Sequence, residues 1–154
     1  MSDYPKELVR RHRLFNGAEV TIRPVRPADA PMEQEFVRHL SDDSRYFRFM
    51  QTLHELSRPK LKYLTDVDYV RRLELVATVG GDDGEHEIGA AMYATEADGE
   101  SCEFAIAVDD AWQGTGVAGI LMIDLMDAAR QRGLREMIGV VLAENHRMVK
   151  FVRQ

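Results

Sequence analysis

The sequence is poor in cysteine and has no long apolar segment. Its 154 residues include a single cysteine, Cys102, which excludes an internal disulfide framework and a cysteine-based zinc site. No apolar run approaches the about 20 residues needed to span a bilayer, and residues 1–15 contain no apolar stretch of the signal-peptide type. The histidines lack the spacing of metal ligands, so we expect no metal. These absences predict a cytoplasmic protein without membrane association.

Basic residues are absent from the middle of the chain. Residues 73–110 contain 11 Asp and Glu and no Lys or Arg, within a chain of net charge -6 and pI 5.4. A nucleic-acid-binding domain is expected to have a basic stripe and a high pI, so we expect no nucleic-acid partner. The acidic segment would attract a cationic ligand or a basic protein patch, although we expect most of its acids to lie in solvated turns.

Length and residue pattern predict one domain, over residues 1–154, with an α/β (α+β) fold. Strands are expected at 20–22, 73–79, 86–95, 101–108 and 136–142. Helices are expected at 30–40, from Ser41, at 57–64, at 117–132 and at 145–154, the first capped by Asp29. Three of the strands form an antiparallel meander, and the unit from Ser101 to Leu142 is a parallel strand–helix–strand crossover. The expected structure is therefore a mixed central sheet with helices on both faces.

A glycine-rich turn, QGTGVAG over residues 113–119, precedes the helix expected at 117–132. Backbone N–H groups at a helix N-terminus bind anions, and glycines let a phosphate approach the backbone. No Lys-Ser/Thr pair follows, which excludes a P-loop. The turn also satisfies G-x-G-x-x-G, but three strands of antiparallel character precede it. The about 40 residues after it are too few for a second mononucleotide-binding half, so a dinucleotide site is disfavoured.

Glu103 is the best candidate for a general base. Strand alternation places Glu103 on one face with Ala105 and Ala107, and turns the intervening apolar residues to the other face. A carboxylate in a groove of small residues, partly buried there, would be a better proton acceptor. Among the alternatives, Glu74 would hold a substrate ammonium group or be an exposed strand acid. Cys102 is expected in the core, and Trp112 would shelter a cofactor or pack as an ordinary aromatic.

Five segments of the chain resemble one protein family: YPKEL, VTIRPVRPADAPM, LSDDSRYFRFM, EFAIAVDDAWQGTGVAG and VLAENHRM. They resemble the GNAT superfamily of N-acetyltransferases, and most closely the acetyltransferase domain of bacterial protein-lysine acetyltransferases. The signature Gln/Arg-x-x-Gly-x-Gly/Ala is matched by Gln113, Gly116 and Ala118. Asn145 matches the asparagine that begins the helix after the next strand. The resemblance runs from Tyr4 to the end of the chain.

The resemblance implies an enzyme that uses acetyl-CoA and no metal. The general base would be Glu103, and the acceptor would be the lysine ε-amine of a protein such as an acyl-CoA synthetase. The backbone of Val108 would bind the pantetheine arm, and Asn145 would contact that arm or the thioester. The pyrophosphate would lie on the turn that follows Gln113, on the N–H groups of Gly114, Thr115, Gly116, Val117 and Ala118. A small-molecule amine acetyltransferase and a non-catalytic acyl-CoA-binding module are the alternatives.

Two features depart from the family. The sequence stops at Gln154, inside the last expected helix, where family members continue through Leu-Gly-Phe and two further strands. A sheet without those strands would expose an edge, so we expect a homodimer or a segment supplied by another chain. Many members also carry a tyrosine on the last helix that protonates the departing thiolate. Phe151 and Val152 stand in that neighbourhood here.

Overall fold

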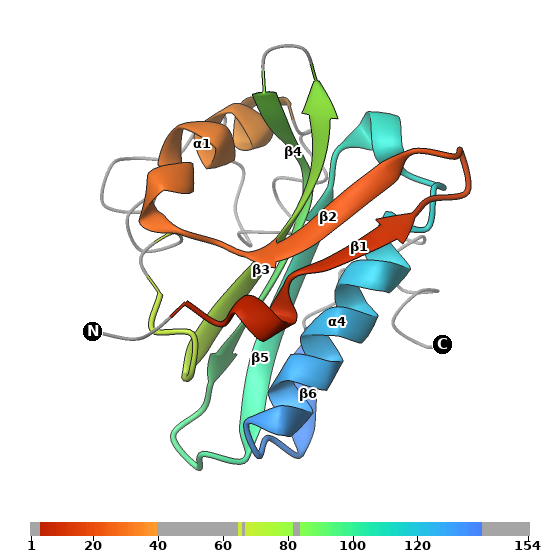
Figure 1. Ribbon diagram of the computed structural model, residues 1–154. Helices are drawn as coiled ribbons and strands as arrows, with labels where there is room; N and C mark the ends of the chain where they lie inside the picture. Colours follow the sequence, from red (N-terminus) through yellow and green to blue (C-terminus); the bar gives the residue numbers. More distant parts are fainter. Residues whose placement is uncertain (1–3, 40–64, 66, 82–83, 140–154) are drawn as a thin grey trace.

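A computed structural model of the protein describes residues 4–39, 65, 67–81 and 84–139. These residues form a six-stranded sheet in the order β1-β2-β3-β4-β5-β6 (Figure 1). The strands are β1 (Arg10–Arg13), β2 (Glu19–Pro24), β3 (Arg72–Gly81), β4 (Gly84–Thr95), β5 (Ser101–Val108) and β6 (Glu136–Gly139). The helices are α1 (Ala30–His39) and α4 (Val117–Gln131), with 3-10 turns η1 (Lys6–Leu8), η2 (Pro27–Asp29) and η3 (Asp110–Trp112).

The mixed sheet expected from the sequence is confirmed. Each strand from β1 to β5 pairs antiparallel with the next, and β6 pairs parallel with β5 after the α4 crossover. The helix expected at 117–132 is α4, and Gly133, at φ +83°, follows its end as glycine commonly does at that position. The result is an α+β fold whose parallel unit lies at one edge of an antiparallel meander.

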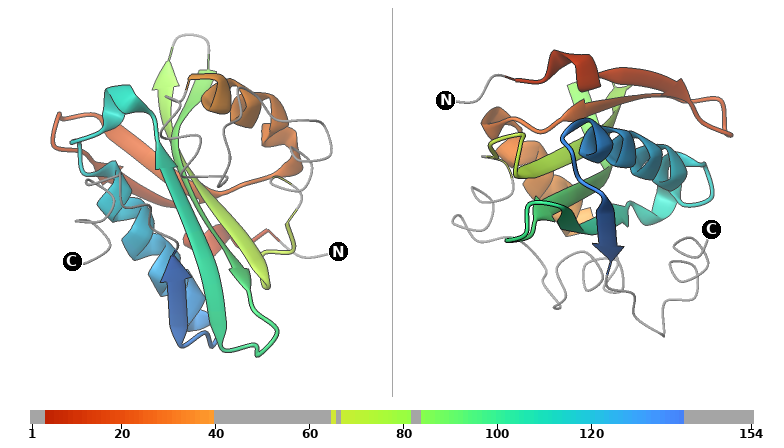
Figure 2. Two further views of the ribbon diagram at one scale, coloured as in Figure 1. Left: turned by 180° about the vertical axis from the view of Figure 1, so that it is seen from behind. Right: turned by 90° about the horizontal axis from the view of Figure 1, so that it is seen from below.

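The two helices cover opposite faces of the sheet (Figure 2). On one face α4 packs closely on β4. The close approach is seen at Gly89, where an added Cβ atom would lie 3.0 Å from Leu121 Cδ1. The strand registers place Ile22, Leu75 and Ile106 on this face, and all three are 0% exposed. On the opposite face α1 buries Phe36 and Val37. We refer to these as the α4 face and the α1 face.

Strand β1 was not expected, because its sequence, RRHR, has no apolar residue. Its alternate side chains instead contact a buried carboxylate on α4. Arg10 Nη1 lies 3.0 Å from Asp124 Oδ1, and His12 Nε2 lies 3.1 Å from Asp124 Oδ2. Asp124 is 5% exposed. These contacts, which we call the polar tether, therefore hold β1 along α4. A strand held in this way has no apolar periodicity, so the sequence pattern does not predict it.

The expected role of Asp29 as the helix cap is wrong in detail. Asp29 lies in η2, one residue before α1, and its carboxylate accepts the N–H of Arg26 at 2.7 Å. It also accepts two hydrogen bonds from the buried guanidinium of Arg23, at 2.7 and 2.9 Å. A buried ion pair in this position needs its full set of partners to offset desolvation. Asp29 thus fastens the start of α1 to β2.

Several expected elements lie outside the described residues. They are the helices from Ser41 and at 57–64, the last helix at 145–154, and the end of the strand expected at 136–142. Among the described residues, no helix is long and apolar enough to cross a membrane.

Candidate active site

The glycine-rich turn leaves the end of β5 through η3 and is ordered by its own side chains. Asp109 accepts the N–H of Ala111 at 2.9 Å, and the buried Thr115 hydroxyl donates to the Trp112 carbonyl at 2.6 Å. Gln113 donates from its amide to Asp110 at 3.2 Å. The side chains of Gln113 and Thr115 thus bond within the turn.

Glycine is required at two positions of the turn. Gly114 has φ +82° and Gly116 has φ +94°, a conformation that costs an L-residue about 1–2 kcal/mol. Gly116 is the N-cap of α4, so the N–H groups of the first helical turn lack intrahelical acceptors. Aligned N–H donors at a helix start attract phosphate. The geometry fits the diphosphate of an acyl-CoA.

Among the described residues, one edge of β5 is open over the part that precedes the turn. Asp109 N–H donates to Ile88 O across the β4 ladder at 2.9 Å. Hydrogen-bonding direction alternates along an antiparallel strand, so the backbone groups of Ile106 and Val108 point away from β4. On that side β6 pairs with residues 101–104. Within the described part of the chain, residues 105–108 have no ladder partner there.

Glu103 lies on the α1 face, as strand alternation predicted, but it is not partly buried. It pairs with Ala94 of β4 and Ile138 of β6, one residue before Phe104, the last residue of β5 that pairs with β6. Its side chain is exposed, so the expected burial is wrong. From Val108 to Glu103 the strand covers about 17 Å, at about 3.3 Å per residue. The carboxylate therefore lies at the far end of the open edge from the glycine turn.

Glu74 differs from the expectation in two respects. One of the two expectations was an exposed strand acid, but Glu74 is fully buried, at 0% exposed. The sequence also places Glu74 on the strand next to that of Glu103, whereas β4 lies between β3 and β5. Opposite residues share a face, so Glu74, Met92 and Ala105 form one row and Arg72, Ala94 and Glu103 the next. Glu74 and Glu103 thus share the α1 face, over a floor rich in alanine. They are about 12 Å apart, being separated by two strand spacings across the sheet and two residues along it.

The remaining expectations have mixed outcomes. Cys102 is in the core at 0% exposed, and burial raises the pKa of its thiol to about 11. Of the acids expected in solvated turns, Asp98 is exposed, whereas Glu87 is 6% exposed. Glu85 accepts hydrogen bonds from Arg23 at 3.0 and 3.2 Å.

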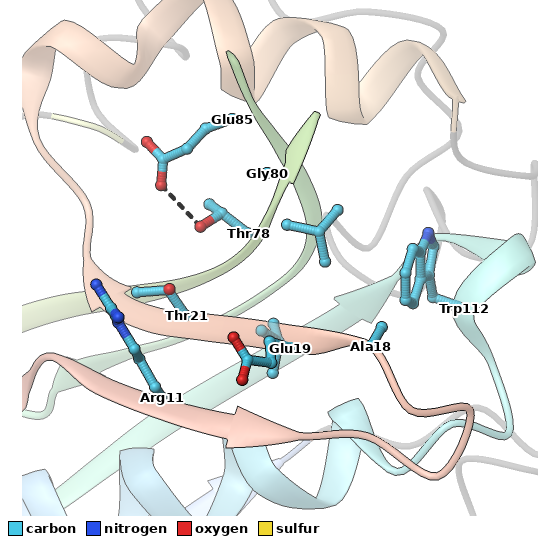
Figure 3. A pocket seen from close by; sticks show the side chains of 10 residues that line it. Arg11, Ala18, Glu19, Thr21, Thr78, Gly80, Glu85 and Trp112 are labelled. Carbon is cyan, nitrogen blue, oxygen red and sulfur yellow. Dashed lines mark hydrogen bonds between the residues drawn. The ribbon is translucent and has the colours of Figure 1, made fainter. Parts of the chain in front are cut away.

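Trp112 is half-buried and forms one wall of a groove of about 580 Å³ on the α1 face (Figure 3). Ala18 of the β1–β2 hairpin faces it, and Thr78 donates to Glu85 at 2.7 Å along the floor. The groove adjoins the glycine turn through Trp112 and does not include Glu103. Its charged lining residues are Arg11, Glu19 and Glu85. Glu85 accepts hydrogen bonds from Arg23 and Thr78, and Glu19 accepts one from Arg13.

The structure thus brings Val108 and the turn residues 113–118 together at one end of β5 and holds Glu103 at the other. Asn145 lies outside the described residues. Among those described, no three His, Cys, Asp or Glu side chains form a group that could hold a metal ion. Sequence reasoning missed Ile106, whose backbone points to the same edge as Val108. The signal was available, because residues two apart on a strand present their backbone groups to the same side.

A strand edge open among the described residues and running into a glycine-rich helix start has the shape and donors that suit an extended ligand ending in phosphate. Residues 34–154 match the family model described as the acetyltransferase (GNAT) family. The chain belongs to this family, whose members use acetyl-CoA.

Three similar proteins illustrate the relationship. Acetyltransferase PA5475 of Pseudomonas aeruginosa is 38% identical over 135 residues, which cover 88% of this chain and 73% of that protein. The GNAT domain of S. lividans PAT has a TM-score of 0.90 at 31% identity, covering 98% of this chain and 88% of that one. The cAMP-binding acyltransferase from Mycobacterium smegmatis has a TM-score of 0.64 at 27% identity, covering 96% of this chain and 43% of that one. This chain therefore spans less than half of the last of these proteins.

Proposed function

We propose that this acetyltransferase transfers the acetyl group of acetyl-CoA to the ε-amine of a lysine in a protein, with Glu103 as the general base. The observation that carries the proposal is the open edge of β5. Among the described residues, it presents the backbone groups of Ile106 and Val108 in line with the glycine turn. A pantetheine arm, with its two amides, would add to this edge as an extra strand does.

The residues fit acetyl-CoA at both ends of the edge. Ile106 and Val108 would bond the amides of the arm, and the N–H groups of Gly114, Thr115, Gly116, Val117 and Ala118 would hold the diphosphate. Asn145 is the further residue that the resemblance assigns to the arm. Bound acetyl-CoA supplies an acetyl thioester, and a direct reaction requires that the thioester reach the part of β5 near Glu103.

Proton transfer is the task of Glu103. A lysine amine has a pKa of about 10.4, so it arrives protonated at pH 7 and must lose a proton before its nitrogen can attack. Glu103 would accept one proton from the ammonium group, and the neutral nitrogen would then form a bond to the acetyl carbon while the carbon–sulfur bond breaks. The second proton that the nitrogen loses on forming the amide goes to the departing sulfur, so the products are CoA thiol and an acetylated lysine. The exposure of Glu103 suits this role, because a lysine on a folded protein must reach it from solvent.

A protein acceptor is supported by two observations. The chain resembles protein-lysine acetyltransferase domains over almost its full length, and it is similar to the GNAT domain of S. lividans PAT. Strands β4 and β5, the neighbouring strand and the strand that carries Glu103, also belong to the segment 73–110, which contains 11 acids and no basic residue. Such a segment attracts a cationic side chain.

The test is Glu103→Gln, which keeps the shape of the side chain and removes its basicity. Acetyl-CoA binding, measured by calorimetry, should be nearly unchanged, and turnover at pH 7 should fall about 10²–10⁴-fold. The loss should shrink as pH rises, because more of the lysine then arrives neutral. Glu74→Gln is the comparison, since Glu74 lies on the same face but is buried.

Four outcomes would contradict the proposal. Full activity of Glu103→Gln at pH 7 would remove Glu103 as the base, and a drop that is equal at every pH would indicate a positioning role. Turnover of polyamines or aminoglycosides without any protein acceptor would support the small-amine alternative. Binding of acetyl-CoA with no thiol released for any acceptor would indicate a non-catalytic module.

A further inference from the structure

Phe15 is the most exposed large apolar side chain among the described residues, at 87%. It lies in the tight turn between β1 and β2, which is well ordered. Leu14 N–H donates to Ala18 O at 2.8 Å, and Ala18 N–H donates to Asn16 Oδ1 at 3.0 Å. Gly17, at φ +86°, completes the turn. The Phe15 ring is therefore held on a fixed support in water, where apolar surface is unfavourable.

The same turn is fastened to the glycine-rich segment. Phe15 N–H donates to Thr115 O at 3.0 Å. A Cβ atom at Gly116 would lie 3.1 Å from Phe15 Cε2 and 3.2 Å from Cζ, so the ring lies against the backbone of Gly116. One edge of the ring thus contacts the N-cap of α4, and most of the remaining ring surface is open to solvent.

This placement matters because of the chemistry of CoA. In that molecule a single ribose separates the diphosphate from adenine, a flat aromatic base. A ligand whose diphosphate binds at the start of α4 would therefore carry its base within a short distance of Phe15. Bases stack on aromatic side chains in a way that tolerates solvent at the edges.

We propose that Phe15 is a contact for the adenosine end of CoA, a positioning residue on the β1–β2 hairpin. The inference rests on the proposed function, because it assumes that the diphosphate binds at the glycine-rich turn. It assigns a ligand contact to a segment that comes about 100 residues before the turn in the sequence. It also explains why a large apolar ring is kept exposed at this position.

The experiment separates the two halves of CoA. Binding of CoA, 4′-phosphopantetheine and adenosine 3′,5′-bisphosphate is measured by calorimetry for the wild-type chain, Phe15→Ala and Phe15→Trp. Phe15→Ala should weaken CoA and the bisphosphate about 5- to 20-fold, in the lower range of base-stacking effects. It should leave 4′-phosphopantetheine unchanged, because that ligand lacks the base. Phe15→Trp should restore CoA affinity.

Val70→Ala is the matched control. Val70 is another exposed apolar residue, 58% exposed, and it precedes β3 at the end of the sheet opposite the turn. This variant should bind all three ligands as the wild type does. Equal weakening of CoA and 4′-phosphopantetheine in a folded Phe15→Ala would overturn the inference, since the residue would then act by holding the turn. Unchanged CoA affinity would overturn it as well. Failure of the wild-type chain to bind CoA at all would instead refute the proposed function on which it rests.

Discussion

The two faces of the sheet differ in what they bury. The α4 face is apolar at its centre, with Leu73, Leu121 and Leu125 all at 0% exposed, and the buried Asp124 lies toward its β1 side. The α1 face carries alanines on β4 and β5 together with Glu74, Glu103 and the ion pair of Arg23 with Asp29. The comparison indicates that packing on one side stabilises the fold. On the other face, small side chains surround the exposed Glu103.

The largest effect on stability is expected on the α4 face. Leu125→Ala should lower the free energy of unfolding by about 2–5 kcal/mol, because it opens a cavity where the helix meets the sheet. Urea denaturation measures the change. Ile123→Ala, two residues away on the same helix and 60% exposed, should stay within about 0.5 kcal/mol. Equal losses in the two variants would contradict the assignment of this face as the main source of stability.

The ion pair on the α1 face is expected to have the next largest effect. Arg23→Gln removes the partner of the buried Asp29, and breaking a buried pair costs about 3–5 kcal/mol. Glu85 is the other partner of Arg23, and its side chain is 43% exposed. We therefore expect a smaller loss, about 2–3 kcal/mol in the free energy of unfolding at pH 7. Thermal unfolding followed by circular dichroism measures this loss of stability.

The same variant has a predicted pH dependence. Burial by itself would raise the pKa of Asp29, but the hydrogen bonds from Arg23 and from Arg26 N–H outweigh burial and lower it. Hydrogen bonds from Arg23 likewise hold the pKa of Glu85 below its usual range. Both carboxylates therefore stabilise the fold above the ordinary carboxyl pKa of about 4 and lose this contribution as pH falls below it. The stability difference between wild type and Arg23→Gln should shrink on acidification, and a difference that grows would contradict the sign.

The tether between β1 and α4 should have a smaller effect. Asp124→Asn keeps the shape of the side chain and loses the charge that Arg10 and His12 face, so we expect a loss of about 1–2 kcal/mol. Asp127→Asn is the control, because Asp127 also contacts Arg10 at 3.3 Å but has a side chain 36% exposed. Its loss should be below about 0.5 kcal/mol. If the two variants lose equal stability in denaturant titrations, burial of Asp124 is not what gives the tether its strength.

The smallest effect, and one of opposite sign, is expected at the start of α4. A Cβ atom at Gly119 would meet nothing within 4 Å, so Gly119→Ala should stabilise the helix by about 0.5–1 kcal/mol. Gly114→Ala should destabilise by about 1 kcal/mol, since Gly114 has φ +82°. Melting temperatures of the two variants measure both effects. A lower melting temperature for Gly119→Ala would contradict the open space at this position.

The fold was predictable where apolar periodicity and glycine mark the elements. The strands at 73–79, 86–95 and 101–108 alternate or run apolar between glycine turns, and each is found within β3, β4 or β5. Strand β1 was not predictable, because its side chains bind Asp124, more than 100 residues away in the sequence. The site was predictable in part. Its turn has a local glycine pattern, whereas the burial of Glu74 and the exposure of Glu103 depend on what packs over each strand.

The sequence by itself determined the strand alternation that turns Glu103 and Cys102 to opposite faces, and the glycines that allow the turn before α4. These features are local, set by backbone conformation and by the period of two along a strand. The tertiary structure decided which carboxylates are buried, which edge of β5 is left open, and that Phe15 lies against Gly116. Those features depend on contacts between segments far apart in the chain, and no local pattern encodes such contacts.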